Sequence, residues 1–447
     1  MRYSEARMRT KRVYVETWGC QMNLHQSEGI SGILVEAGYS LTDQLEEADV
    51  ALLNGCMVRQ KAEEKVYGRV GAVVEEKRKR PVILGVGGCL GQIRGVDLLE
   101  RFAAVDFVFG SDAHQSLPER IETAARGTAT APSEIDAGTV EETPFVRSSD
   151  TVAMVTITEG CSNFCSYCVV PYARGPMRSR SAARILEEVQ EARRAGYREV
   201  LLLGQNVNAY GTDRNDVMDF AELLRRVAET GIERIRFTSS HPRDMSTRVW
   251  EAMAAHDALC PHVHLACQAG SNRILERMNR GYTREAFQRI VRDARTIVSG
   301  INVTTDIIVG YPGESEEDFE GTLSLLTEMR FGSVFAAKYS PRPHAASSRL
   351  TDDVTNEEKS KRLQRVLELQ RRIARTENER LVGRTVDVLV EGESRNGGAY
   401  GRAADHRTAV VGTMAEVGEI LPVRIESATS AALYGIALVP EKARSPR

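Results

Sequence analysis

Three short apolar runs, separated by two helical stretches, define the first part of the chain. The helical stretches cover residues 27–37 and 61–79. Alternation of strand and helix predicts a parallel sheet with right-handed crossovers. We therefore expect an N-terminal α/β domain over about residues 12–145. Its predicted buried strands are residues 13–15, 50–53 and 82–86.

Six more strand-like runs follow a stretch rich in Pro, Thr and Ser at residues 128–150, which we interpret as a connection. Helical spacers separate the runs, so the sequence predicts six βα units, too few to close a standard eight-unit barrel. We expect a partial barrel whose lateral gap could admit a large substrate. With its connecting helix, this domain spans residues 146–376. The predicted strands are 153–157, 200–203, 235–238, 263–265, 305–309 and 336–339.

The last part of the chain combines one amphipathic helix with several short strands. Apolar positions recur at helical spacing within residues 357–380. The other face of this helix is rich in Lys and Arg, which is either a solvated surface or a contact for phosphate groups. Short strands with Gly-rich turns then predict a small β-barrel over residues 377–440. These strands are 385–390, 409–411, 421–425 and 433–437.

Composition narrows the class of protein. The chain has 447 residues and a formal net charge of -3, so any contact with RNA must be a local patch. Eight cysteines are too few for a disulfide framework in a chain of this length. No apolar run follows the basic residues at 2–12, which argues against a signal peptide or a membrane anchor. We expect a protein of the reducing cytoplasm with no membrane attachment.

Cys161, Cys165 and Cys168 lie close together directly after the first strand of the predicted barrel. One loop can therefore aim all three sulfurs at one point. Zinc would need a fourth ligand nearby, and the next candidate is His241; a disulfide is disfavoured because nothing indicates export. Iron–sulfur clusters bind cysteine thiolates at such spacings, and three ligands leave one iron of a [4Fe-4S] cluster open. The segment therefore predicts a cluster that can bind a small molecule.

The Cys-x3-Cys-x2-Cys spacing also resembles the signature of the radical S-adenosylmethionine enzymes. The resemblance implies that the open iron binds S-adenosylmethionine, which an electron from the cluster cleaves to a 5′-deoxyadenosyl radical. It further implies contacts with this cofactor at Gln205, Asn206 and Asp306, near the carboxyl ends of barrel strands. From position alone, a structural role in a loop is an equal alternative for each.

Cys20, Cys56 and Cys89 each follow a predicted strand of the N-terminal sheet and a glycine. The carboxyl ends of parallel strands meet at one edge, where ligands bind. Glycine permits the sharp turn that presents the next side chain at this edge. A structural thiol would explain any one of these cysteines, but the threefold repeat favours a second iron–sulfur cluster, again with three protein ligands.

The residues around these cysteines resemble the N-terminal domain of the methylthiotransferases. The triplet 21–23, Gln-Met-Asn, is similar to the MiaB branch, which modifies tRNA, rather than to the branch that acts on a ribosomal protein. Gly55 and Met57 depart from the Thr and Ser that are usual in the family. The predicted C-terminal barrel resembles the TRAM domain, which binds RNA.

The resemblance spans about residues 12–440 and implies a reaction. Two molecules of S-adenosylmethionine would be used per turnover. One would methylate a sulfur held at the N-terminal cluster, and the second would be cleaved at the other cluster. The resulting radical would take the hydrogen from adenine C2 of N6-isopentenyladenosine, next to the anticodon of tRNA, and C2 would then accept the methylthio group. A reductant protein such as flavodoxin or ferredoxin is implied, and we expect a monomer.

Two alternatives remain open. The first is a methylthiotransferase acting on ribosomal protein S12 or on threonylcarbamoyladenosine in tRNA. The second is a non-enzymatic iron–sulfur protein that binds RNA or carries electrons. Outside the two cysteine trios, Cys260 and Cys267 have no partner at ligand spacing, and we expect both to be buried. His262 and His264 are expected to be hydrogen-bonded residues of the core.

Overall fold

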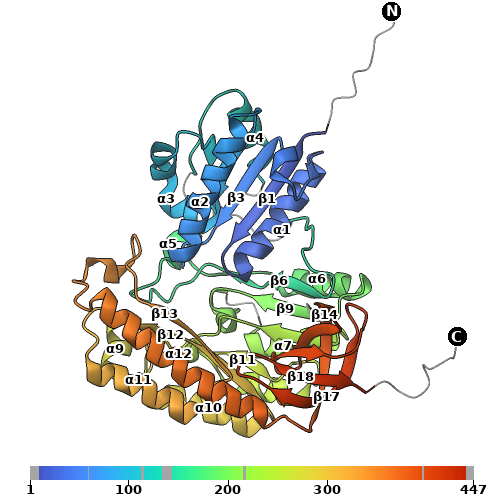
Figure 1. The fold of residues 1–447 in the computed structure, drawn as a ribbon, viewed down its shortest axis with the longest axis vertical. Coiled ribbons are helices and arrows are strands. Elements are labelled where there is room, and N and C mark those ends of the chain that lie inside the picture. The colour runs from blue at the N-terminus through green and yellow to red at the C-terminus, as the bar shows by residue number, and fades with distance from the viewer. Residues whose placement is uncertain are drawn as a thin grey trace, which may run out of the picture.

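The computed structural model describes residues 10–58, 60–111, 115–132, 143–214, 218–394 and 397–438. Part of the predicted connection at 128–150 therefore lies outside the described residues. Figure 1 shows an N-terminal domain above a central pair of sheets, with a small C-terminal barrel at the other side. In the part of the chain that is described, no helix combines the length and the apolar character needed to cross a membrane.

The N-terminal domain is a five-stranded sheet in the order β2-β1-β3-β4-β5, and all its strand pairs are parallel. This confirms the predicted parallel α/β domain. Helix α1 begins just after Cys20, earlier than predicted. Helix α3 was not predicted, because its glycines have low helix propensity. The strands are β1 (Arg12–Trp18), β2 (Ser40–Leu41), β3 (Val50–Gly55), β4 (Ile83–Gly87) and β5 (Phe107–Val108). The helices are α1 (Gln21–Glu36), α2 (Gln60–Lys77), α3 (Gly88–Arg101) and α4 (Leu117–Ala125).

The central domain contains the six predicted βα strands in two three-stranded parallel sheets, β10-β9-β6 and β11-β12-β13. Two isolated bridges, Ile235 with Leu259 and Ser240 with Leu265, join the sheets in chain order, so the result is an open partial barrel, as predicted. The six strands are β6 (Val152–Thr156), β9 (Glu199–Leu203), β10 (Arg234–Phe237), β11 (His262–His264), β12 (Asn302–Val309) and β13 (Ser333–Lys338). Two further short strands, β7 (Thr158–Glu159) and β8 (Arg178–Ser179), pair with each other.

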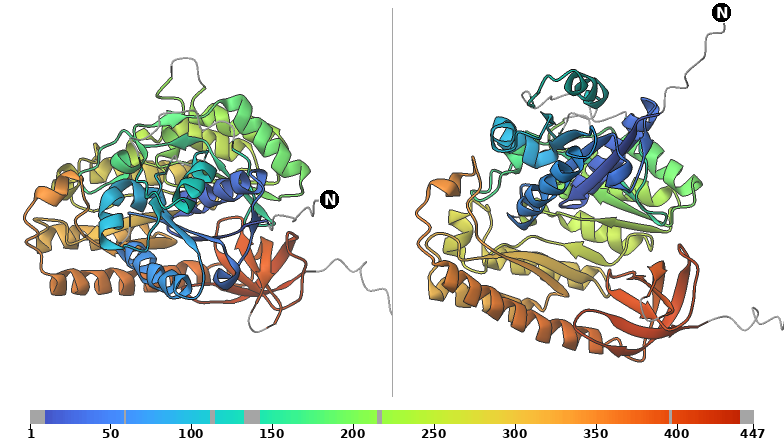
Figure 2. Two further views of the ribbon diagram at one scale, coloured as in Figure 1. Left: turned by 90° about the horizontal axis from the view of Figure 1, so that it is seen from above. Right: turned by 45° about the horizontal axis from the view of Figure 1, so that its top comes forward.

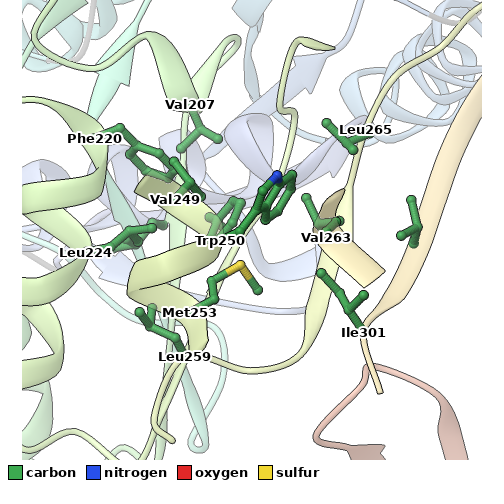
Figure 3. Packing of buried hydrophobic residues seen from close by; sticks show 14 of the residues in the cluster. Val207, Phe220, Leu224, Val249, Trp250, Met253, Leu259, Val263, Leu265 and Ile301 are labelled. Atoms are coloured by element: carbon green, nitrogen blue, oxygen red, sulfur yellow. The ribbon is translucent and has the colours of Figure 1, made fainter. Parts of the chain in front are cut away.

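Helices pack around these sheets and bury one large hydrophobic core. Trp250 on α8 lies at its centre, between Phe220 and Leu224 of α7 and Val263 of β11 (Figure 3). Its side chain is almost fully buried. The helices are α5 (Val170–Arg174), α6 (Ala182–Arg194), α7 (Phe220–Glu229), α8 (Thr247–Ala255), α9 (Asn272–Arg277), α10 (Arg284–Ile297), α11 (Glu316–Met329) and α12 (Asn356–Glu379).

Helix α12 runs along the outside of the central domain toward the C-terminal barrel (Figure 2). Much of its basic face is paired with carboxylates: Arg362 contacts Glu314 at 2.8 Å, and Arg365 contacts Glu316 at 2.7 Å. The ion pairs with α11 favour a structural role for this face over a contact with phosphate groups. The Arg365 pair is exposed and contributes little stability, whereas Arg362 and Glu314 are buried. The apolar side of the helix, with Val366 and Ile373, packs on the domain and holds it in place.

The C-terminal domain is a closed barrel with the strand order β14-β15-β16-β18-β17, which confirms the predicted small β-barrel. Strand β15 was not predicted because one of its inward positions is Gly401, which gives no apolar signal. A Cβ at Gly401 would lie 1.8 Å from the carbonyl oxygen of Leu389, so only glycine fits. The strands are β14 (Thr385–Glu393), β15 (Ala399–Ala403), β16 (Thr408–Val411), β17 (Ile420–Ala428) and β18 (Leu433–Ala437).

The C-terminal barrel docks on the amino ends of the central strands. Arg234 and Arg236 of β10 donate hydrogen bonds of 2.8 to 2.9 Å to its main-chain carbonyls. Asn302, the first residue of β12, donates to the carbonyl of Asp405 at 2.9 Å. The His262 ring lies 4.6 Å from that of His406. The barrel is therefore fixed at the end of the central domain opposite the Cys161 loop.

We predict that Arg236→Met destabilises this junction. Arg236 is 2% exposed and pairs with buried Glu199 at 2.7 Å, so its loss leaves a buried carboxylate unpaired. Such a loss costs about 3–5 kcal/mol. Guanidinium unfolding should show the decrease, and hydrogen exchange in β15 should accelerate. Arg424→Met, an exposed change on the outside of the same barrel, is the control. Equal stability of the two variants would contradict the docking role.

Candidate active site

The first cysteine trio lies at the carboxyl edge of the N-terminal sheet. Cys20 precedes α1, Cys56 follows β3, and Cys89 is in the first turn of α3. Their strands β1, β3 and β4 are neighbours in the sheet, so the edge brings together cysteines far apart in sequence. Cys56 and Cys89 are buried, whereas Cys20 is exposed.

These three thiols are close enough to change each other's ionisation. A hydrogen bond from Cys56 lowers the pKa of Cys20 to about 5, and the charge of Arg174 acts in the same direction. The same contact, followed by burial and the charges of Cys20 and Cys89, raises the pKa of Cys56. The trio therefore favours at least one thiolate, the form that binds metal.

Two glycines make the convergence possible. A Cβ at Gly19 would lie 2.5 Å from that of Cys56. Gly88 has φ +75°, and a Cβ there would lie 2.1 Å from Oδ1 of Asn54. The predicted role of glycine next to these cysteines thus has a steric basis. Gly55 is packed too, with Leu90 Cβ at 2.9 Å from a Cβ built there, so Thr would not fit without movement.

The second trio occupies the loop after β7, at the carboxyl end of the first central strand. The loop is fixed by main-chain bonds from Cys161 to Gly175 at 3.1 Å and from Cys168 to Cys165 at 2.9 Å. Burial raises the pKa of Cys161. Burial and the neighbouring Cys165 charge raise that of Cys168 to about 12. The three thiols therefore lie close enough to interact electrostatically.

Each trio offers three cysteine thiolates, a donor set that suits an iron–sulfur cluster. In a [4Fe-4S] cluster each thiolate binds a different iron atom, so the sulfurs need to be farther apart than around one zinc. The donor chemistry, three cysteines without carboxylate or imidazole, also suits iron–sulfur ligation.

Polar atoms without partners gather beside the second trio. Gln205 Oε1 and Asn206 Oδ1, after β9, are buried and have no hydrogen-bond partner among the described residues. The same holds for Thr158 Oγ1, Ser240 Oγ and His241 Nε2 at neighbouring strand ends. Buried polar groups are normally paired, so this set fits a polar ligand such as S-adenosylmethionine.

His241 contributes a donor to this polar set. Burial, and next the charge of Arg280, lowers the pKa of His241 to about 3, so the ring is neutral near pH 7. Its Nδ1 accepts a hydrogen bond from the backbone N–H of Arg243 at 3.2 Å. The ring proton is therefore assigned to Nε2, the unpartnered atom.

The predicted cofactor residues divide between two places. Gln205 and Asn206 lie together, and Asn206 also donates to Asp244 Oδ2 at 2.6 Å. Asp306 is on β12 in the other sheet, where its carboxylate contacts His264 Nε2 at 3.1 Å. Cys260 and Cys267 are buried, as expected, and His262 and His264 both contact Thr304.

Two arginines at the cysteine sites were not predicted from the sequence. Arg174 Nε donates to Cys89 Sγ at 3.2 Å, and Arg280 Nη1 donates to Cys165 Sγ at 3.1 Å. Each comes from a segment distant from its cysteine, so no local spacing indicates the contact. The position of Arg174, shortly after Cys168, was the one available hint.

Helix α5 links the two trios. It starts two residues after Cys168 and ends at Arg174, whose guanidinium reaches Cys89. Ala173 packs in the same core cluster as Cys89 and Leu90. Helix α5 lies beside α3, the helix that contains Cys89 (Figure 1). The two cysteine sites are thus neighbours.

Comparison with solved structures agrees with this fold. A radical S-adenosylmethionine methyltransferase, TsrM from Kitasatospora setae, with cobalamin and a [4Fe-4S] cluster bound, superposes with a TM-score of 0.57. The match covers 76% of this chain and 74% of that chain at 14% identity, so it shows likeness of fold alone. The complex of the same enzyme with tryptophan and an analogue of S-adenosylmethionine superposes with a TM-score of 0.58.

Comparison with protein families and relatives identifies the chain's family. Residues 155–326 match the Radical SAM superfamily, 12–110 match Uncharacterized protein family UPF0004, and 379–438 match the TRAM domain. The tRNA-2-methylthio-N(6)-dimethylallyladenosine synthase of Geotalea uraniireducens is 44% identical, over 96% of this chain and 99% of the relative. The enzyme of that name from Thermotoga petrophila is 42% identical, over 97% and 99%. The chain therefore belongs to the family of tRNA-2-methylthio-N(6)-dimethylallyladenosine synthases, which carry a radical S-adenosylmethionine domain.

Proposed function

We propose that this protein is a tRNA-2-methylthio-N(6)-dimethylallyladenosine synthase. It replaces the hydrogen at adenine C2 of N6-isopentenyladenosine, next to the anticodon of tRNA, with a methylthio group. The observation that carries the proposal is the pair of adjacent thiol trios, joined by α5, in a chain 44% identical to a synthase of this name over nearly its full length. Relatives of this name favour the isopentenyladenosine substrate over ribosomal protein S12 and threonylcarbamoyladenosine.

Six cysteines would hold two [4Fe-4S] clusters. Cys20, Cys56 and Cys89 would hold the first cluster. The second cluster would be held by Cys161, Cys165 and Cys168. With S-adenosylmethionine, the bound clusters supply the radical that activates the C2–H bond and the methylthio group that replaces the hydrogen. An sp² C–H bond has no useful acidity, so side-chain acid–base catalysis alone would not serve.

The protein itself binds and orients S-adenosylmethionine and excludes water from the site. Cys161 and Cys165 are each 8% exposed, so solvent has little access to the reactive site. Gln205, Asn206 and Ser240 present the unpartnered buried oxygens that would accept hydrogen bonds from the amino group of S-adenosylmethionine. His241 Nε2 would donate to an acceptor atom of the same molecule. Asp306, oriented by His264, would contact it from the other sheet.

The partners follow from the domains. The TRAM domain and the names of the relatives support tRNA as the substrate. The open edge of the central domain, where the β13 side chain of Phe335 is 49% exposed, offers the lateral entry that a tRNA loop needs. A reductant protein such as flavodoxin or ferredoxin would provide electrons, and we expect the enzyme to act as a cytoplasmic monomer.

Cysteine variants should separate the two trios. Cys161→Ala should remove about half of the iron after anaerobic reconstitution and abolish 5′-deoxyadenosine formation. Cys20→Ala should also lose iron but retain cleavage of S-adenosylmethionine, without methylthiolated RNA. Cys260→Ala, a change at a buried cysteine outside both trios, is the control and should keep full iron content. Undiminished iron in both trio variants would contradict the ligand assignment.

Gln205→Leu should weaken S-adenosylmethionine binding by about tenfold, because one hydrogen bond in a buried site contributes about 1.4 kcal/mol. Calorimetric titration of the reconstituted enzyme measures this dissociation constant. Gln190→Leu, the same change at an exposed position of α6, should leave the constant unchanged. Equal affinity of the two variants would exclude Gln205 from the cofactor site.

The substrate can be tested in the organism that encodes the protein. Deletion of the gene should cause N6-isopentenyladenosine to accumulate in tRNA and should remove its 2-methylthio derivative, as measured by mass spectrometry of tRNA nucleosides. The wild-type gene should restore the derivative, and a Cys161→Ala gene should not. If the deletion strain retains the derivative, the proposed substrate is wrong.

A further inference from the structure

Buried arginines distinguish the two cysteine sites from the rest of the molecule. Among the described residues, seven arginines are buried. Four pair with carboxylates, and Arg234 donates to main-chain carbonyls. Within the described ranges, the two that donate to cysteine sulfur are Arg174 and Arg280, one at each trio. The four paired with carboxylates are Arg180, Arg236, Arg342 and Arg362.

We propose that Arg174 and Arg280 are matched positioning residues that stabilise the anionic clusters and raise their reduction potentials, each acting on one cluster alone. The inference rests on the proposed function, because it assumes that both trios hold clusters. An adjacent anion stabilises a buried guanidinium, and a thiolate-bound iron–sulfur cluster would supply one. Hydrogen bonds and positive charge near the sulfurs favour the more negative, reduced state.

Arg174 completes the N-terminal site from outside the N-terminal sheet. It is 4% exposed and lies at the end of α5, in the segment that follows the second trio. Besides Cys89, it donates to Oε1 of Gln26 at 3.3 Å, and Gln26 in turn donates to the carbonyl of Ser111 at 2.9 Å. The neighbouring charges of Cys89, Glu159 and Cys20 stabilise its cation and raise its pKa.

Arg280 has the corresponding arrangement at the second trio. It is 3% exposed and follows α9. Besides Cys165, its guanidinium contacts the hydroxyls of Tyr167 and Tyr282 at 3.2 and 3.1 Å and the carbonyl of Ala266. The two hydroxyls and the carbonyl are neutral acceptors, so a cluster-bound Cys165 thiolate would be the anionic partner of Arg280. The contacts hold the guanidinium in one orientation against Cys165.

The test measures the potential of each cluster separately in the full-length protein. Two background variants are made, each with all three cysteines of one trio changed to alanine. In each background, the electron paramagnetic resonance signal comes from the remaining cluster. In these two backgrounds, Arg174→Gln should shift the midpoint potential of the N-terminal cluster to more negative values. Arg280→Gln should do the same for the second cluster. Neither change should move the other cluster, and Arg→Lys at each position should restore part of the shift.

Arg234→Gln is the matched control, because it removes a buried arginine that donates to carbonyls rather than to sulfur. It should move neither potential. A fully loaded Arg174→Gln protein with an unchanged potential overturns the proposal. If Arg174→Gln folds but does not retain the N-terminal cluster, retention in Arg174→Lys supports the proposal, and loss from both overturns it. Absence of iron in the background with Arg174 intact instead rejects the cluster assignment itself.

Discussion

The structure depends on bringing six thiols from four separate segments to two neighbouring sites, and parallel-sheet geometry meets this requirement. The carboxyl ends of β1, β3 and β4 lie side by side, and the loop of the second trio follows the carboxyl end of β6 in the central domain. Helix α5 is too short to be stable alone, so packing against α3 defines its position. Its N-cap residue, Val169, and Ala173 join the core of the N-terminal domain. The same packing sets the separation of the two cysteine sites.

Burial of charge is the cost of this arrangement, and the molecule offsets it in two different ways. At the junction with the C-terminal barrel, Arg236 pairs with Glu199 and with main-chain carbonyls, which satisfies the cation within the protein. At the cysteine sites, Arg174 and Arg280 donate to sulfur instead. The first arrangement is complete as folded. The second is suited to a ligand that carries negative charge. The partner of the guanidinium therefore distinguishes a structural arginine from an arginine at the reactive centre.

The sequence was sufficient for the fold class and for the grouping of the cysteines, because strand–helix alternation fixes which strand ends share an edge. It was insufficient for contacts between segments distant in the chain. Arg280 and Cys165 are 115 residues apart, and no periodicity encodes their hydrogen bond. Strand β15 was missed because packing requires glycine at Gly401, and α3 because its glycines resemble a loop. The proposed cofactor contacts are Gln205, Asn206 and Asp306. Their roles depend on how close they lie to the bound cofactor, and a sequence alone does not define that distance.

The position of the C-terminal barrel constrains the size of the substrate. Strand β12 begins at Asn302, which binds the barrel, and Tyr311 just beyond its end contacts Ser166 in the cysteine loop at 2.8 Å. At about 3.3 Å per residue, the eight residues of β12 separate the two ends by about 25 Å. A single nucleotide cannot contact both the barrel and the cysteine site across that distance. A folded RNA can, so a substrate recognised by both parts of the enzyme must be macromolecular, with the target adenine held far from the surface that the barrel binds.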